Sequence, residues 1–235
     1  MLAALGWGSL AASSLVIGAL LAFARDWSRW QIGAVLAFGA GALISAVSFE
    51  LWQEGFQIGG LGWTGLGLAL GALTYFTCDS ALDRHSSQGG EANTGTGLAL
   101  GAFLDGIPEQ LVLGIGLAGG GPVSIALLVA IFASNLPEAI GSATGMEAGG
   151  SPRRSVLLLW LGVAVACALA TGAGYLIADT ASGGLHAAVN GFAAGALLVM
   201  LIDSMVPAAT RDAGRPAGLI TALGFAVAAV LSSLS

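Results

Sequence analysis

The fold of this chain is decided by two apolar runs near its middle, GLALGAFLDGIPEQLVLGIGL at 97–117 and VSIALLVAIFASNLPEAIGSA at 123–143. Each run is long enough to cross a bilayer as a helix, which takes about 20 apolar residues. Halfway along, each carries a polar pair, an aliphatic residue, a proline and a glutamate: DGIPE at 105–109 and SNLPE at 134–138. Because the connection between the runs is too short for anything but a hairpin, the two motifs are predicted to meet at one depth.

The composition of the whole chain is that of a membrane protein. Of its 235 residues 56% are hydrophobic and only 9% are charged, whereas soluble domains carry about 25% charged residues. All seven cationic residues are arginines and form no basic face, so nucleic-acid binding is excluded. Cys78 and Cys167 lie in different apolar runs without CxxC spacing and are expected in the core.

The apolar runs of the chain predict an all-α, polytopic fold with eight transmembrane helices, at 2–24, 31–51, 60–78, 97–117, 123–143, 155–178, 187–208 and 217–234.

The placement of the arginines predicts the orientation. Every arginine falls in the first, third, fifth or seventh connection between predicted helices, and the other connections have none. Cytoplasmic loops are enriched in Lys and Arg, so these connections are predicted to be cytoplasmic and both termini extracytoplasmic. The first run lacks a positive n-region and is expected to be a membrane helix rather than a cleaved leader. The longest connection, 79–96, leaves no room for a soluble domain, so residues 1–235 are predicted to form a single transmembrane domain.

An internal repeat links the second and seventh predicted helices, where FGAGALI at 38–44 matches FAAGALL at 192–198. A displacement of five helices reverses the direction of crossing. Helices 1–3 and 6–8 would therefore form an inverted repeat around helices 4 and 5, a 3+2+3 arrangement typical of secondary transporters. A chance match between small and apolar residues is the alternative. Glycines four residues apart, at 67/71, 97/101 and 191/195, predict close helix packing.

Helical spacing groups the polar side chains of the two central helices. Asp105 shares a helix face with Glu109, and Ser134 and Asn135 share one with Glu138. An ionised carboxylate at a helix centre costs about 2.5–3.5 kcal/mol, so the three acids together would cost roughly 8–10 kcal/mol without a partner. No arginine lies at that depth. Three carboxylates with amide, hydroxyl and carbonyl oxygens would suit a divalent metal ion.

The two prolines add further oxygen atoms. Pro108 and Pro137 cannot donate to the carbonyls of Leu104 and Ala133, so both helices are expected to kink toward the polar centre. The alternative is structural: kinked helices whose protonated glutamates hydrogen-bond across the bundle. Two copies of the motif on adjacent antiparallel helices favour the metal site.

The doubled motif resembles that of the ZIP family of divalent metal transporters, whose members usually carry His-Asn-x-Pro-Glu in the fourth helix and His-Asn/Asp-x-Pro-Glu in the fifth. The resemblance extends over the whole chain, including the Phe-x-Ala-Gly runs of helices 2 and 7. It implies that Glu109 and Glu138 are bridging glutamates and that Asn135 is a metal ligand. It also implies an elevator-like motion of helices 1, 4, 5 and 6 against helices 2, 3, 7 and 8.

The chain resembles a divergent, prokaryotic-type member that lacks the motif histidines. Asp105 and Ser134 stand where these histidines are expected, and Gly106 replaces an asparagine. No acid in 155–178 matches the sixth-helix ligand of two-metal members, so a single-metal site of mostly oxygen ligands is implied. Zinc is the family default. Because oxygen ligands also suit harder ions, manganese, iron and cadmium are alternatives.

Acidic residues outside the motif are candidates for the ion pathway. Glu50 and Glu54 are four residues apart at the outer end of the second helix, where they could collect cations or simply form a solvated helix end. Asp203 in the seventh helix is either an exit-path residue or an interfacial acid. His186 at the start of that helix is expected to be interfacial.

The sequence therefore predicts a transporter that moves a divalent metal ion toward the cytoplasm by alternating access. One alternative is a metal-binding or sensing membrane protein without transport. Another is an intramembrane enzyme that uses Asp105 and Glu109 as acid and base. No nucleophile or second catalytic element is apparent and the motif is duplicated symmetrically, unlike an acid and a base with different roles, so we expect no enzymatic activity. No cofactor is expected besides the transported ion. The expected location is a bacterial cytoplasmic (inner) membrane, with the lipid bilayer and a second copy of the chain, in a homodimer, as partners.

Overall fold

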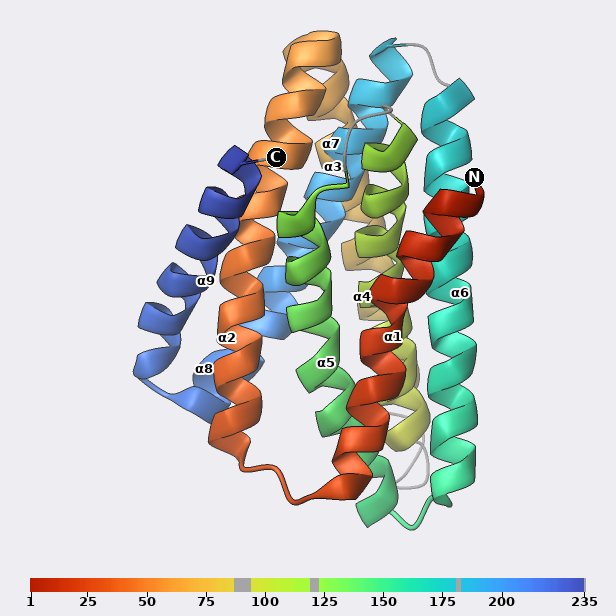
Figure 1. Ribbon diagram of the computed structural model, residues 1–235, viewed down its shortest axis with the longest axis vertical. Coiled ribbons are helices and arrows are strands. Elements are labelled where there is room, and N and C mark those ends of the chain that lie inside the picture. The colour runs from red at the N-terminus through yellow and green to blue at the C-terminus, as the bar shows by residue number, and fades with distance from the viewer. Residues whose placement is uncertain (87–93, 119–122, 181–182, 235) are drawn as a thin grey trace.

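The computed structural model describes residues 1–86, 94–118, 123–180 and 183–234, and for 82–86, 94–105, 179–180 and 234 it describes the backbone alone. It is a helical bundle, as predicted, and each of the predicted segments is helical (Figure 1). The elements are α1 (Leu2–Ala24), α2 (Arg29–Ala46), the π-helix η1 (Val47–Trp52), α3 (Gln53–Ser86), α4 (Thr94–Ala118), α5 (Ile125–Ala148), α6 (Arg153–Thr180), α7 (Gly183–Met200), the π-helix η3 (Leu201–Met205), α8 (Val206–Ala213) and α9 (Pro216–Leu234).

Many of these helices suit a bilayer. Within the described residues, six segments are long and apolar enough to cross a membrane, and Gly106–Ala118 is a shorter apolar helix. The segment Arg29–Ala81 has 53 residues and would be about 80 Å long if straight, far more than a hydrocarbon core of about 30 Å. It is not straight, because Gly60 adopts φ 72° and ψ 178° and the chain turns back there (Figure 1). Glycine reaches such a positive φ without steric cost.

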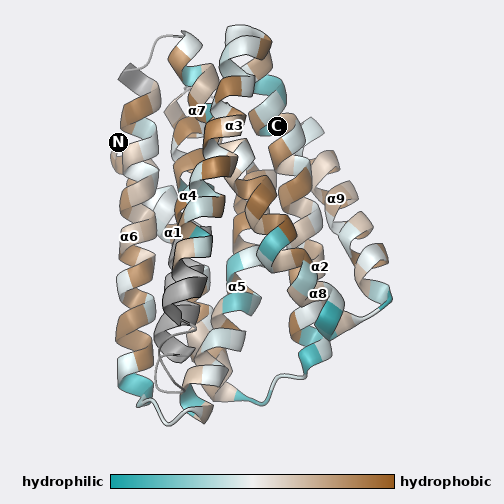
Figure 2. Ribbon diagram, turned by 180° about the vertical axis from the view of Figure 1, so that it is seen from behind, coloured by the Kyte–Doolittle hydropathy of each residue, from teal (hydrophilic) through white to brown (hydrophobic). Residues whose placement is uncertain are grey.

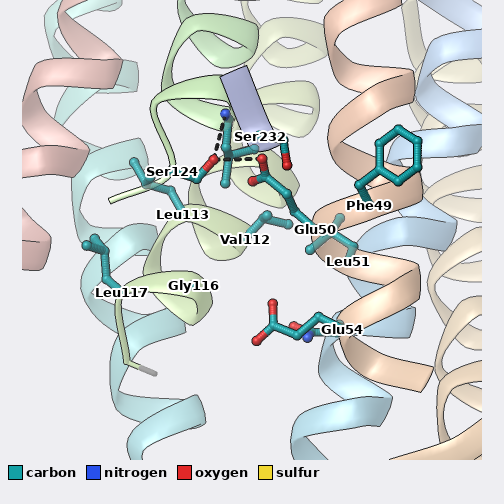
Figure 3. Close-up of a pocket in the computed structure, with 12 residues that line it drawn as sticks. Phe49, Glu50, Leu51, Glu54, Val112, Leu113, Gly116, Leu117, Ser124 and Ser232 are labelled. Carbon is teal, nitrogen blue, oxygen red and sulfur yellow. Dashed lines mark hydrogen bonds between the residues drawn. The ribbon is translucent and has the colours of Figure 1, made fainter. Parts of the chain in front are cut away.

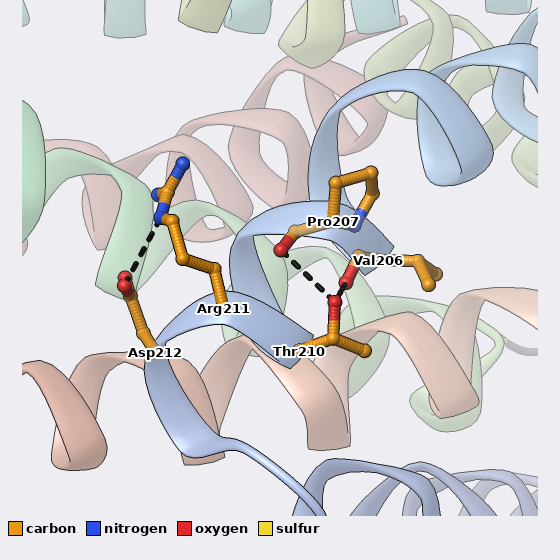
Figure 4. A network of polar contacts seen from close by, with 5 residues as sticks. All are labelled: Val206, Pro207, Thr210, Arg211 and Asp212. Atoms are coloured by element: carbon orange, nitrogen blue, oxygen red, sulfur yellow. Dashed lines mark hydrogen bonds and ion pairs between the residues drawn. The ribbon is translucent and has the colours of Figure 1, made fainter.

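Charge gathers at one end of the bundle. The connections α1–α2, α5–α6 and α8–α9 lie toward the end opposite the two termini, where hydrophilic residues are frequent (Figures 1 and 2). Arg153 Nε lies 2.6 Å from Glu147 Oε1 in the α5–α6 connection. Arg211 Nε lies 3.2 Å from Asp212 Oδ1 in α8, where the Thr210 hydroxyl also donates to backbone carbonyls (Figure 4). Exposed ion pairs contribute only about 0–1 kcal/mol, so these two pairs add little to stability.

The helices pack in two groups. In the first group, α1 packs against α5 and α6, and α6 packs against α4. In the second group, α2 packs against α8 and α9, and α3 packs against α7. Contacts of α2 with α5 and of α4 with α7 join the two groups.

Glycines carry the closest contacts inside the second group. Gly71 of α3 lies against the carbonyl of Phe192 in α7, and Gly224 of α9 lies against the carbonyl of Phe38 in α2. The glycines at 67, 191 and 195 lie equally close to backbone atoms, which confirms the predicted close packing, while the pair at 97/101 lies outside the described side chains. Phe38 and Phe192 are matched positions of the internal sequence repeat.

The two π-helices begin at matched positions of the same repeat. Val47 and Leu201 are separated by the same number of positions as Phe38 and Phe192. A π-helical turn inside an α-helix often accompanies a functional site. The acidic residues Glu50 in η1 and Asp203 in η3 are both placed in such turns.

The two cysteines differ in their surroundings. Cys167 is buried, as expected, but the expectation that Cys78 is buried is wrong, because it is exposed on α3. The face of α3 that carries Leu66 and Leu73 is exposed as well. In a membrane protein, an apolar sequence does not distinguish a helix face that packs against protein from one that faces lipid.

Candidate metal centre

The two Pro-Glu motifs meet where α4 and α5 are in contact. Glu109 is 1% exposed, and its Oε1 accepts a hydrogen bond of 2.8 Å from the hydroxyl of Ser134, which is equally buried. Hydrogen bonds to an ionised carboxylate are roughly twice as strong as neutral ones. Glu109 and Ser134 therefore join the two helices at one depth, as the short connection between the runs predicts.

Asn135 and Glu138 follow on α5 within one helical turn. Asn135 is 1% exposed, and Glu138 is half-buried. In the part of the chain that the structure describes, Asn135 Nδ2 has no hydrogen-bond partner. Leaving a buried amide group unpaired costs about 1–3 kcal/mol. Asp105, the fourth predicted carboxylate or amide ligand, lies in the helical backbone of α4, but its side chain lies outside the described residues.

Pro137 leaves one backbone carbonyl of α5 without its usual helical hydrogen bond. It is buried within α5 and cannot donate to the carbonyl of Ala133. This carbonyl lies beside Gly39 of α2, where an added methyl group would come within 2.9 Å of the oxygen. The oxygen therefore faces α2 at the contact between the two helix groups, and the absence of a side chain at Gly39 allows the approach.

Cys167 brings α6 to the same place. Its side chain is fully buried, and a methyl group at Gly106 would come within 2.8 Å of its sulfur. It interacts electrostatically with both Glu109 and Glu138. The sequence prediction placed Cys167 in the core but missed these neighbours, because nothing in the apolar run 155–178 fixes the rotation of α6 relative to α4.

The described part of this centre is rich in oxygen. Among the residues whose side chains the structure describes, no three of the His, Cys, Asp or Glu type converge closely enough to hold a metal ion. The carboxylates of Glu109 and Glu138 and the amide of Asn135 lie near a thiol. Such a set can bind a cation through oxygen and releases its protons when the cation binds.

A cavity of about 290 Å³ lies on the side of this centre where α4 ends and α5 begins. The Glu50 and Glu54 carboxylates point into it (Figure 3). Both predicted pathway acids are half-buried and line a cavity, so neither is a fully solvated helix end. Residues of η1, α3, α4, α5, α7 and α9 line the cavity. They are Phe49, Glu50, Leu51, Glu54, Val112, Leu113, Gly116, Leu117, Ser124, Leu127, Asn190 and Ser232.

Glu50 is held in place by the first turn of α5. The Ser124 hydroxyl donates a hydrogen bond of 2.7 Å to Glu50 Oε1 and accepts one of 3.1 Å from the backbone N–H of Leu127 (Figure 3). Ser124 is thus the N-cap of α5 and a partner of Glu50 at once. The positive end of the helix dipole favours a carboxylate at this position.

Val112 and Leu113 lie between the cavity and Glu109. They line the cavity, are 1% and 2% exposed, and follow Glu109 on α4 by three and four residues. One helical turn, a rise of about 5.4 Å, therefore separates the cavity from the buried carboxylate. The separating side chains are aliphatic and offer a cation no ligand.

Other polar residues are placed in ways that the sequence reasoning only partly foresaw. Asp203 is exposed on η3 and is not among the residues that line this cavity. Asn190 lines the cavity and was missed, although a lone asparagine in the apolar run 187–208 is a usable signal. His186 interacts electrostatically with Glu54, which its expected interfacial position did not predict.

Comparison with known proteins identifies a relative of this chain. No protein-family model matches the chain. The chain is 27% identical over 228 residues, 93% of its length, to an Arabidopsis thaliana protein named "Putative zinc transporter". It spans 36% of the length of that relative. Together with the apolar helices, this similarity indicates an integral membrane protein that is similar to a protein named as a zinc transporter.

Proposed function

We propose that the protein is a ZIP-type transporter that carries a divalent metal ion across a membrane toward the cytoplasm. The observation that carries the proposal is the buried carboxylate of Glu109, bonded to Ser134 across the α4–α5 contact and close to Cys167. Similarity to a protein named as a zinc transporter supports a metal as cargo and zinc as its first candidate. The bacterial cytoplasmic membrane and the homodimer remain predictions.

The cargo would be held by oxygen atoms from α4 and α5. Glu109 and Glu138 supply carboxylates, Asn135 supplies its amide oxygen, and Asp105 completes the set. Ser134 holds Glu109 by its hydrogen bond and offers a hydroxyl oxygen when that bond opens. A divalent ion among these groups offsets the cost of burying them. Oxygen ligands suit zinc, and also manganese, iron and cadmium.

Eight crossings and an inverted repeat are part of the proposal. The reversal at Gly60 divides Arg29–Ala81 into two crossings, and α4 adds one to the other apolar segments. The contact pattern supports a 3+2+3 arrangement, since exchanging the two repeats turns the α2–α9 contact into α7–α3 and the α1–α5 contact into α6–α4. The matched π-helices η1 and η3 support it further.

Alternating access would come from motion of the first helix group against the second. Glycine contacts lock α2 to α9 and α3 to α7, and Gly114 of α4 lies against the carbonyl of Thr171 in α6. The helix pairs α2–α9, α3–α7 and α4–α6 are thus tightly packed. All four proposed ligands come from α4 and α5, so the ion would move with the first group.

Radiometal uptake tests the proposal. Wild-type protein and the variants Glu109→Ala and Glu138→Ala are reconstituted in proteoliposomes, with zinc, manganese, iron and cadmium in competition. Ser9→Ala is the control, because the Ser9 hydroxyl is exposed and bonds only to a carbonyl of its own helix among described residues. We expect time-dependent uptake by wild type and Ser9→Ala and its loss in both glutamate variants. Undiminished uptake by either glutamate variant would remove the proposed site.

A metal-binding or sensing protein without transport is the second candidate. The replacement of both motif histidines, by Asp105 and by a Ser134 hydroxyl that is bonded to Glu109, favours it. In the same assay it predicts saturable metal binding with no increase in trapped metal over time.

A further inference from the structure

The cavity beside the candidate centre contains a buried amide whose hydrogen-bonding groups are unmatched. Asn190 of α7 is 0% exposed and lines the cavity. Neither its Oδ1 nor its Nδ2 has a hydrogen-bond partner among the described residues. Each unmatched group costs about 1–3 kcal/mol, and most buried polar atoms in proteins avoid that cost. A ligand that fills the cavity would supply the missing partner.

The acidic residues of the cavity lie close to this amide. A methyl group at Gly55 would come within 3.2 Å of Asn190 Cβ, so Asn190 packs beside the residue that follows Glu54. Glu54 interacts electrostatically with Glu50 and with His186. His186 precedes Asn190 by one turn of α7, and its Nε2 is buried with no hydrogen-bond partner in the described part of the chain. Glu50, Glu54 and Asn190 thus line one cavity, and His186 lies near Glu54, although the two carboxylates and the imidazole do not converge closely enough in this conformation to hold a metal ion by themselves.

We propose that Glu50, Glu54 and Asn190 form an outer capture site for a divalent cation, with His186 beside it. The Glu50 and Glu54 carboxylates face the same cavity from different sides (Figure 3), and each attracts a divalent cation that enters it. The amide oxygen of Asn190 supplies a third oxygen ligand. The nearby imidazole favours a transition metal such as zinc over magnesium or calcium, and the oxygen ligands also suit manganese.

The capture site and the central site belong to different helix groups. Glu50, Glu54 and Asn190 come from η1, α3 and α7, whereas Glu109 and Glu138 come from α4 and α5. An ion held by the first set must pass Val112 and Leu113 to reach the second. The place of the capture site in an uptake pathway rests on the proposed transport function. Its ability to bind a cation does not.

Binding of Mn²⁺ to the purified full-length protein tests the inference. Bound Mn²⁺ is measured by loss of the six-line electron paramagnetic resonance spectrum of the free ion. The starting variant is Asp105→Asn/Glu109→Gln/Glu138→Gln, which removes the three central carboxylates. We expect it to keep about one Mn²⁺ site per chain. Adding Glu54→Gln or Asn190→Leu should weaken this binding by at least about tenfold, and adding Asn190→Asp, which keeps an oxygen ligand, should preserve it.

Gln110→Met is the matched control. Gln110 is also a fully buried amide whose Nε2 has no described hydrogen-bond partner, but it lies on α4 against Thr171 and does not line the cavity. In the starting variant it should leave Mn²⁺ affinity unchanged. An equal loss of affinity in Gln110→Met and Asn190→Leu would assign the effect to packing and overturn the site.

Two other outcomes also overturn it: no Mn²⁺ binding by the starting variant, or binding that Glu54→Gln and Asn190→Leu leave unweakened. If Asn190→Leu is not monodisperse in gel filtration, the half-buried Glu54→Gln carries the test. Because transport is not measured, the transport proposal can fail in the uptake assay while this site stands, and the reverse also holds.

Discussion

The substitution Gly71→Ala tests how the second helix group is held together. Gly71 lies so close to the Phe192 carbonyl that a methyl group would overlap the backbone of α7, and no flexible side chain can move aside. Overpacking of this kind costs about 1–3 kcal/mol, and loss of a Cα–H···O contact costs a further 0.5–1 kcal/mol or so. The higher helix propensity of alanine compared with glycine stabilises the folded state by about 0.8–1.0 kcal/mol and offsets part of this cost. We expect a net loss of about 1–3 kcal/mol in the free energy of unfolding.

The matched control is Gly65→Ala on the same helix, where nothing lies within 4 Å of an added methyl group. It should leave stability unchanged or raise it by up to about 1 kcal/mol. The repeat provides a second pair: Gly224→Ala, against the Phe38 carbonyl, should cost as much as Gly71→Ala, and Gly218→Ala, in open space, should cost nothing. Unfolding in mixed micelles, followed by tryptophan fluorescence, gives all four values. Equal stability of Gly71→Ala and Gly65→Ala would refute the close contact.

Three further predictions concern the central site. Metal uptake should fall as pH drops below neutral, because protons compete with the metal for the carboxylates, and a flat profile in proteoliposomes would argue against carboxylate ligands. Gly106→Ala should cost about 1–3 kcal/mol of unfolding free energy, and at least half of that should disappear in a Cys167→Ala background, since the Cys167 sulfur is the obstacle. A double-mutant cycle without coupling would place the sulfur elsewhere. Ser134→Ala should cost about 1–3 kcal/mol by removing the hydrogen bond to buried Glu109, whereas exposed Ser9→Ala should cost little; similar losses in both would contradict the buried bond.

Hydropathy predicts the helices of this chain well. The first predicted segment begins and ends at the same residues as α1, Leu2 and Ala24, because the apolar run and the helix end together. The predicted third segment begins at residue 60, where the chain reverses, but the stretch 52–59 that the prediction left as a connection is helical in the structure. The π-helical turns have no sequence signature that hydropathy could detect.

The candidate site was predictable where a short connection fixes how two helices lie against each other. Glu109 and Ser134 were expected to meet because a short connection joins their helices, and they do. Cys167 and Asn190 were missed because their roles depend on how α6 and α7 are rotated against their neighbours. Such rotations follow from glycine contacts between helices, and an apolar run does not encode them in its composition.

The most direct measurement is a structure of the protein with zinc, in which anomalous scattering at the zinc absorption edge locates the ion. We predict a peak between α4 and α5, with oxygen atoms of Glu109 and Glu138 about 2.0–2.2 Å from it. No peak there at a zinc concentration that sustains uptake, or a peak in the outer cavity alone, would contradict the assignment of these two glutamates as the ligands of the transported ion.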